Sequence, residues 1–210
     1  MSTFFLNRLT TEPHALAFAG QSTPWPVALA DQTTDPSLDE ALRGHVAAAN
    51  RLLAPAAADL LATTGRPVDL FGFTPNPARL GAAADATASV EGVALTQLGA
   101  LLDLEHLGYS VAQAKPVAVL GHSQGVLAVH MTRAIEAAGS IEAAGKTLDE
   151  ILAVAALIGA AGTRRVRELG LNPKYGEASP MLSVKGATRE QVEALVKRVN
   201  NARGSISIAV

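Results

Sequence analysis

The sequence predicts an α/β fold in which helices cover a parallel sheet. Two observations support this prediction. Short apolar segments typical of strands alternate with longer segments whose apolar residues have helical spacing. One of the apolar strands also leads through a glycine-rich turn directly into a helix. Parallel strands need long crossover connections, and helices of this kind supply them.

Composition excludes several function classes. The 210 residues suffice for a substantial core. The formal net charge of -2 gives no basic surface for nucleic acid, and the absence of cysteine excludes disulfides and thiolate metal sites. No apolar run approaches the roughly 20 residues that cross a bilayer, and Met1–Thr10 lacks a secretory signal. We therefore expect a globular, cytoplasmic protein with no nucleic-acid partner, no membrane partner and no metal site.

The first part of the chain predicts one strand and one interrupted helix. Ala15–Gly20 is a short apolar run, which predicts a buried strand that feeds a loop. Ser37 and Glu40 have the spacing of a capping box, which predicts a helix start there. Pro55 is expected to break or kink this helix.

The middle of the chain predicts a loop and then a second helix. Residues 66–88 carry three prolines and little periodicity, so they are predicted to be mostly loop. The following helix has Leu95, Leu98 and Leu102 on one face and is expected to end near Gly108.

Two more helices are predicted around and beyond the glycine-rich turn. Val117–Leu120 is predicted to be a strand, and the helix after the turn should extend to about Ala138. Thr147 and Glu150 form another capping-box pattern, which predicts a helix from there to Gly170.

The pattern changes after Ser179-Pro180. Met181–Val184 is predicted to be a strand, Thr188 and Gln191 to cap a helix, and Ser205–Val210 to be a second strand. A single β-α-β unit leaves strand edges unpaired. We therefore expect that the natural polypeptide continues past Val210 or that another chain completes the unit.

The turn itself is the main chemical signal. Gly-His-Ser-Gln-Gly at 121–125 stands between the apolar strand and the helix. A strand that turns sharply into a helix strains the residue at the corner, and glycines two positions away permit the close approach this requires. Ser123 would then present its hydroxyl as a nucleophile, with backbone N–H groups near Gln124 available to an oxyanion.

A nucleophilic serine also needs a base. The histidines are His14, His45, His106, His122 and His130. Folds with this turn place the catalytic histidine after the serine in chain order. His122 adjoins the serine with its side chain expected to point elsewhere, and His130 lies about two helical turns away. We expect all five to be structural or surface residues and the base to lie outside this stretch.

Four motifs together resemble the acyltransferase domains of fatty acid synthases, especially the acetyltransferase region of the bacterial type I multienzyme. They are Phe-Ala-Gly-Gln-Ser at 18–22, Gly-Val-Ala-Leu-Thr-Gln at 92–97, the motif at 121–128 and Leu-Ile-Gly-Ala-Ala-Gly at 157–162. The resemblance implies an α/β-hydrolase-like large subdomain over 1–178, incomplete here. It also implies the start of a ferredoxin-like small subdomain over 179–210. Ser22 departs from the glycine that usually follows the family's glutamine.

The resemblance also implies roles for site residues. Ser123 would be the nucleophile, Gln21 and the Gln124 N–H the oxyanion donors, and Gln97 a residue lining the same cavity. The remaining residues of the substrate site would be Gly121, His122, Gly125 and Ile158. The family's catalytic histidine lies downstream of the small subdomain, so this chain corresponds to about the first half of such a domain and is expected to be inactive alone.

Ile158 bears on the substrate. Members that transfer malonyl groups carry an arginine at the equivalent place, and its guanidinium pairs with the malonyl carboxylate. An aliphatic side chain cannot offset the desolvation of a carboxylate, which favours a neutral acetyl group. The simpler interpretation, that Ile158 is only a core residue, is compatible with this.

The sequence thus predicts transfer of acetyl from acetyl-CoA through a Ser123 ester to the phosphopantetheine of acyl carrier protein, within a fatty acid synthase multienzyme and with no permanently bound cofactor. The alternatives are a serine esterase or thioesterase with the same turn, or a catalytically inert part of an assembly. Arg164, Arg165 and Arg167 suit the negative end of a helix dipole, and contact with CoA phosphates is the alternative for them.

Overall fold

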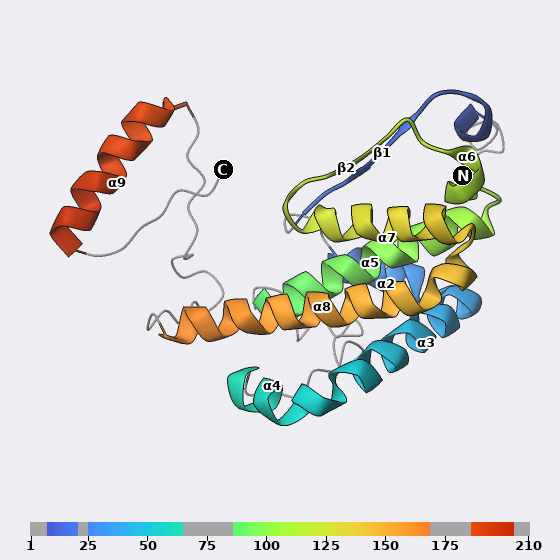
Figure 1. Ribbon diagram of the computed structural model, residues 1–210, viewed down its shortest axis with the longest axis horizontal. Helices are drawn as coiled ribbons and strands as arrows, with labels where there is room; N and C mark the ends of the chain where they lie inside the picture. The colour runs from blue at the N-terminus through green and yellow to red at the C-terminus, as the bar shows by residue number, and fades with distance from the viewer. Residues whose placement is uncertain (1–7, 21–24, 65–85, 169–185, 204–210) are drawn as a thin grey trace. The chain divides into compact units, whose positions relative to one another are not determined.

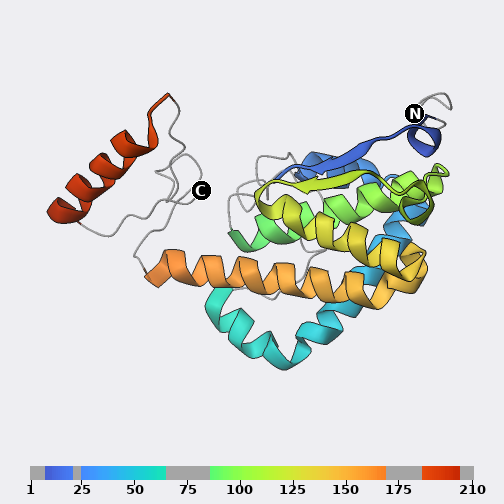
Figure 2. The ribbon, with the colours of Figure 1, turned by 45° about the horizontal axis from the view of Figure 1, so that its top comes forward.

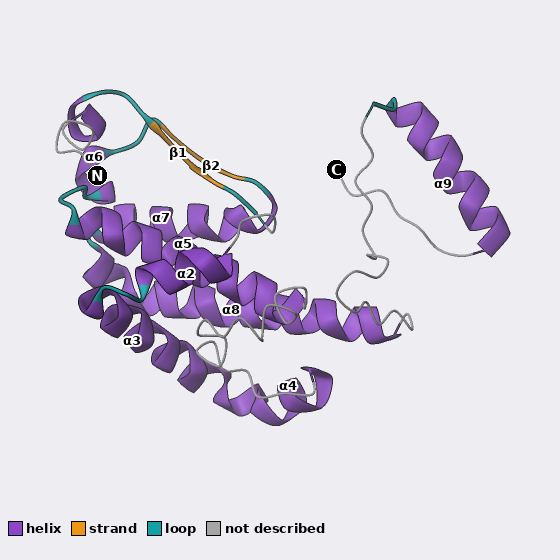
Figure 3. Cartoon of the chain, turned by 180° about the vertical axis from the view of Figure 1, so that it is seen from behind, coloured by secondary structure: helices purple, strands orange, loops and turns teal. Residues whose placement is uncertain are grey.

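The computed structural model describes residues 8–20, 25–64, 86–168 and 186–203. Most of the described chain is helical, with a single pair of strands (Figure 3). The chain divides into two compact units, Met1–Tyr175 and Gly176–Val210. The predicted boundary between residues 178 and 179 lies outside the described residues, so the two predicted subdomains stay a prediction.

The two strands are those that the sequence predicted in this part of the chain. β1 (Ala15–Phe18) and β2 (Ala118–Gly121) pair in parallel, with Ala15 opposite Ala118 and Phe18 opposite Gly121. Leu16 and Phe18 pack against the core, whereas the alternate residues of β1 are exposed. The expectation of a buried first strand was therefore wrong, because the described helices cover only one face of the pair. The α/β-hydrolase-like fold stays a prediction.

A helix that the sequence analysis did not predict follows β1 in the described chain. α2 (Trp25–Gln32) is anchored by Trp25 and Leu29, both buried. Its Trp25 ring lies against Gly92, where an added Cβ would overlap the ring. Eight residues give too few helical repeats to reveal this helix by periodicity, so tertiary contact with the helix bearing Gly92 stabilises it.

The next helix begins two residues before its predicted start. α3 (Pro36–Leu53) is capped by Asp35, whose Oδ1 accepts from the backbone N–H of Ser37 at 2.8 Å and of Leu38 at 3.2 Å. The predicted cap at Ser37 was wrong, because proline at the first helical position and aspartate before it already form the start. Pro55 interrupts the helix as predicted, through η1 (Ala54–Ala56), before α4 (Ala57–Thr64).

Among the described residues, the longest run of buried residues lies in α5 (Ala86–His106). Its predicted end near Gly108 is confirmed, since Gly108 has a φ of +93°. A one-turn helix, α6 (Val111–Ala114), precedes β2 and was not predicted.

Two antiparallel helices complete the first unit. α7 (Val126–Ala138) ends at Gly139, which has a φ of +86°. α8 (Ile141–Glu168) starts before its predicted beginning, because Ser140 Oγ accepts from the Ala143 N–H at 3.1 Å. The predicted cap at Thr147 was wrong: that residue lies inside the helix, where its neighbour Leu148 belongs to the buried face.

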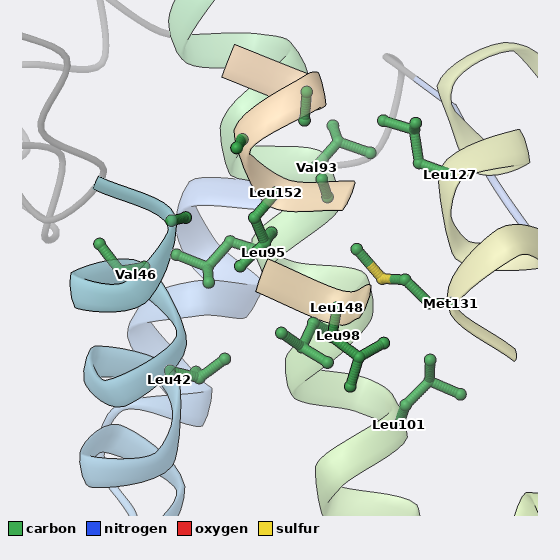
Figure 4. Close-up of a cluster of buried hydrophobic side chains, with 14 of the residues drawn as sticks. Leu42, Val46, Val93, Leu95, Leu98, Leu101, Leu127, Met131, Leu148 and Leu152 are labelled. Carbon is green, nitrogen blue, oxygen red and sulfur yellow. The ribbon is translucent and has the colours of Figure 1, made fainter. Parts of the chain in front are cut away.

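The core forms where α3, α5, α7 and α8 meet (Figure 4). α7 separates the strand pair from α5 and α8, and α3 packs on the opposite side of α8 (Figures 1 and 2). The fully buried side chains at this junction include Leu42, Leu95, Leu98, Leu101, Met131, Leu148 and Leu152. Burial of each such side chain contributes about 1.5–3 kcal/mol.

The second unit is described only over residues 186–203. α9 (Arg189–Arg203) has the predicted capping box: the Thr188 N–H donates to Gln191 Oε1 at 2.9 Å, and the Gln191 N–H donates to Thr188 Oγ1 at 3.3 Å. The two strands predicted on either side of it lie outside the described residues. Within the described ranges, no helix has the length and apolar character to span a membrane.

Candidate active site at the corner between β2 and α7

The chain reverses direction at Ser123. β2 ends at Gly121, His122 is still extended, and Ser123 has a φ of +53° before η4 (Ser123–Gly125) leads into α7. In the described residues only Lys115 and Ser123 combine a side chain with a positive φ. This conformation costs roughly 1–3 kcal/mol and persists only where the surroundings enforce it. The strained corner predicted from the sequence is confirmed.

Two glycines permit this corner, as predicted. A Cβ added to Gly121 would lie 2.5 Å from the carbonyl carbon of Gly125. A Cβ added to Gly125 would overlap the carbonyl oxygen of Phe18. Both clashes are with backbone, which cannot rotate away, so any side chain at either position displaces the strand or the corner.

A third glycine completes the corner, and its role was not predicted. A Cβ on Gly20 would lie 2.7 Å from the His122 carbonyl oxygen, 2.8 Å from Ser123 Cβ and 3.4 Å from the Gln124 amide nitrogen. Gly20 follows β1 and is distant from Ser123 in sequence. The only sequence signal was its place in the Phe-Ala-Gly-Gln-Ser motif, because the closeness of the two turns arises from the pairing of β1 with β2.

The other predicted site residues differ in their surroundings. Ser123 and His122 are exposed, and Gln124 is half-buried with its Oε1 enclosed and without a hydrogen-bond partner. Gln97 is buried on α5, and its Nε2 donates to the Ala19 carbonyl at 2.6 Å. Gln21 lies outside the described residues.

Ile158 is not a core residue, so that part of the expectation was wrong. Its exposure is 50%, because it lies on the face of α8 that carries the exposed Val154 and Leu157, away from the buried Leu152 and Ala156. Its part in choosing the acyl group stays a prediction.

Two of the five histidines make structural contacts. His14 Nδ1 contacts the Glu12 carbonyl at 2.9 Å and must carry a proton there, so neutral His14 accepts from the Tyr109 hydroxyl through Nε2, at 2.6 Å. Burial, with the nearby Glu136 carboxylate, raises the pKa of Tyr109. In the part of the chain that the structure describes, no hydrogen bond joins Ser123 to any histidine.

His45 is also structural. Its Nδ1 lies 2.6 Å from Asp149 Oδ1, which links α3 to α8. The remaining three histidines, His106, His122 and His130, are exposed.

The arginines near the end of α8 pair with a carboxylate of the same helix, and both the helix-dipole interpretation and the contact with CoA phosphates stay predictions. Arg164 and Arg165 lie 3.9 and 3.2 Å from the Glu168 carboxylate. The side chain of Arg167 is not described. Among the described residues, no cluster of three His, Cys, Asp or Glu side chains could hold a metal ion.

This geometry suits nucleophilic attack on a carbonyl carbon. The Ser123 hydroxyl is exposed at the start of a helix, where backbone N–H groups and the helix dipole favour a developing negative charge. The Gln124 amide lies at this helix start. Gly20 has no side chain that would crowd this amide.

Comparison with known proteins gives one match. The family model described as "Starter unit:ACP transacylase in aflatoxin biosynthesis" matches residues 82–209, more than half of the chain and including Ser123. No curated protein matched the chain. No solved structure matched it either.

Proposed function

The chain belongs to the family of starter unit:ACP transacylases, which place an acyl group on acyl carrier protein, and we propose that its reaction proceeds through an ester on Ser123. The observation that supports this is the left-handed backbone of Ser123, held between three glycines at a strand-to-helix corner. Strain at a functional position is retained where it presents a reactive group.

The proposed first half-reaction loads the enzyme. Ser123 Oγ attacks the carbonyl carbon of an acyl-CoA thioester while a general base takes the hydroxyl proton. The oxyanion that forms faces the Gln124 N–H, with Gln21 as the second donor. The carbon–sulfur bond then breaks, and CoA leaves as the thiol after it takes up a proton.

The second half-reaction unloads it. The phosphopantetheine thiol of acyl carrier protein attacks the Ser123 ester, the carbon–oxygen bond breaks, and the proton released by the thiol returns to the serine. The same oxyanion donors stabilise both intermediates, because each has its negative charge on the same oxygen.

We further propose acetyl as the acyl group and a fatty acid synthase as the setting. Ile158 offers no cation to an acyl carboxylate. A buried carboxylate without a partner costs several kcal/mol, so malonyl is disfavoured. The four motifs that resemble synthase acyltransferases support the setting.

The test uses the intact acyltransferase domain, including the downstream histidine that the resemblance implies, and labelled acetyl-CoA, with and without a carrier thiol, followed by intact-protein mass spectrometry. We expect a stable acetyl mass shift that the thiol discharges. Ser123→Ala should abolish the shift, and Ser37→Ala, which alters an exposed serine of α3, should leave it unchanged. Rapid acetate release that the thiol does not affect would indicate an esterase or thioesterase. An undiminished shift in Ser123→Ala would exclude this serine as the nucleophile.

A further inference from the structure

We propose that Gln97 is a positioning residue: it holds Ala19 and Gly20, which follow β1, against Ser123 and the Gln124 amide that would donate to the oxyanion. This inference rests on the proposed function, and it gives Gln97 a role other than direct contact with the substrate.

The orientation of the Gln97 side chain is fixed by its partner. Nε2 lies 2.6 Å from the Ala19 carbonyl oxygen, which can only accept a hydrogen bond. The amide group therefore presents its nitrogen to Ala19, and its oxygen points elsewhere. That oxygen is buried and has no hydrogen-bond partner. Burial of an acceptor without a partner is unfavourable, so packing alone would favour an apolar side chain at position 97. What the amide adds to packing is therefore its hydrogen bond to Ala19.

Two hydrogen bonds hold the end of β1 and the residue after it. On one side the His122 N–H donates to the Phe18 carbonyl at 3.0 Å, which ties the end of β1 to the corner. On the other side Gln97 binds the next carbonyl, that of Ala19. Gly20 follows immediately and abuts Ser123 and the Gln124 amide. Loss of the Gln97 bond therefore loosens the residues that border the oxyanion site, while the corner itself keeps its own contacts.

Gln97 is well placed to serve as a fixed point. Its neighbours Val93, Ala94 and Leu98 on α5 are fully buried, and Gln97 itself is 7% exposed. α5 packs against η4 as well as α2, α3, α7 and α8. The helix thus has little freedom to follow a displaced turn.

A matched control exists on α2. Gln32 Nε2 donates to the Thr96 carbonyl at 3.0 Å, and its Oε1 is likewise buried without a hydrogen-bond partner. This bond joins α2 to α5 and does not touch the turn after β1. Gln97→Met and Gln32→Met therefore remove the same kind of bond from two places and leave a side chain of similar length.

We expect Gln97→Met to lower the acylation rate constant at saturating acyl-CoA by about 10- to 100-fold, with apparent substrate affinity changed less than about threefold. Gln32→Met should leave both unchanged. Amide hydrogen exchange in peptides covering residues 17–20 and 122–126 should accelerate in Gln97→Met but not in Gln32→Met.

A third variant distinguishes the hydrogen bond from packing. Gln97→Glu can donate to Ala19 only when its carboxyl group is protonated, and burial raises the pKa of such a group. The ratio of the Gln97→Glu rate to the Gln97→Met rate should therefore rise as pH falls. Any general base is common to both variants, so its titration cancels in this ratio.

The outcomes separate the two proposals. If the intact wild-type domain forms no acyl-enzyme, the proposed function fails, and with it the positioning role of Gln97. If wild type acylates and Gln97→Met matches it in rate and in exchange, only the positioning role is overturned. If Gln32→Met lowers the acylation rate as much as Gln97→Met does, Gln97 contributes only general packing and the positioning role is overturned. A ratio of the Gln97→Glu rate to the Gln97→Met rate that does not change with pH would overturn it as well.

Discussion

Substitution of Gly20 by alanine tests the corner most directly. The added methyl group would lie 2.7 Å from the His122 carbonyl oxygen and 2.8 Å from Ser123 Cβ. Comfortable carbon–carbon contact is about 3.5–4.0 Å, so the turn and the corner must separate by roughly 1 Å. The third contact, 3.4 Å from the Gln124 nitrogen, is the one nearest the proposed oxyanion.

Two effects of Gly20→Ala can be estimated from this displacement. Overpacking of this kind costs about 1–3 kcal/mol of folding stability, which the protein should survive. A shift of about 1 Å in a reacting group lowers the rate about 100-fold. We therefore expect a folded protein whose acylation rate is reduced by about two orders of magnitude.

The assay is the time course of acetyl-enzyme formation by intact mass, with thermal unfolding measured in parallel. Gly44→Ala in α3 is the matched control, because nothing lies within 4 Å of the added methyl group. In a helix interior this change should stabilise the protein by about 0.5–1 kcal/mol and leave acylation unaltered. If a folded Gly20→Ala protein is acylated at the wild-type rate, the argument that the turn after β1 borders the reacting centre is refuted.

Three further outcomes are expected. Ile158→Arg should raise the use of malonyl-CoA relative to acetyl-CoA by about tenfold, measured as the ratio of kcat/KM values, whereas Val154→Arg one turn earlier should not; an unchanged ratio would mean that residue 158 does not meet the acyl group. Leu152→Ala should lower the free energy of unfolding by about 2–5 kcal/mol in urea titrations, against about 0.5 kcal/mol or less for the half-exposed Val154→Ala, and equal losses would contradict the packing of α8. The Ser37 hydroxyl and two backbone N–H groups lower the pKa of Asp35 from its ordinary value of 3.8, so its contribution to stability is present above that value and is lost as pH falls through the lower folded value. Acid unfolding followed by circular dichroism should therefore be less steep in Asp35→Asn, which keeps the cap without the charge, and identical acid transitions would show that Asp35 does not contribute.

Local signals sufficed where one segment determines its own shape. Gly-His-Ser-Gln-Gly between an apolar strand and a helix predicted a strained backbone at Ser123, which the structure shows as a positive φ, because a strand that turns into a helix this sharply strains the corner residue. The break at Pro55 and the capping box of Thr188 with Gln191 were also predicted correctly, because each depends only on the backbone of its own segment.

The predictions that were wrong concern features that depend on packing between segments. Ser37 and Thr147 both have cap-like spacing, but Asp35 with Pro36 and Ser140 begin their helices earlier, and packing of the extended helices then fixes the choice. α2 lacks a local signal and is stabilised through its contact with α5.

The sequence by itself determined which reactive groups are present: it places a serine at a strained corner, contains no cysteine, and carries motifs that resemble those of acyltransferases. Tertiary structure alone decided which distant residues meet that corner. β1 pairs with β2 in register, and this brings Gly20 against Ser123 and Ala19 within reach of Gln97. Sequence patterns report the periodicity of single elements, whereas these contacts depend on how separate elements align.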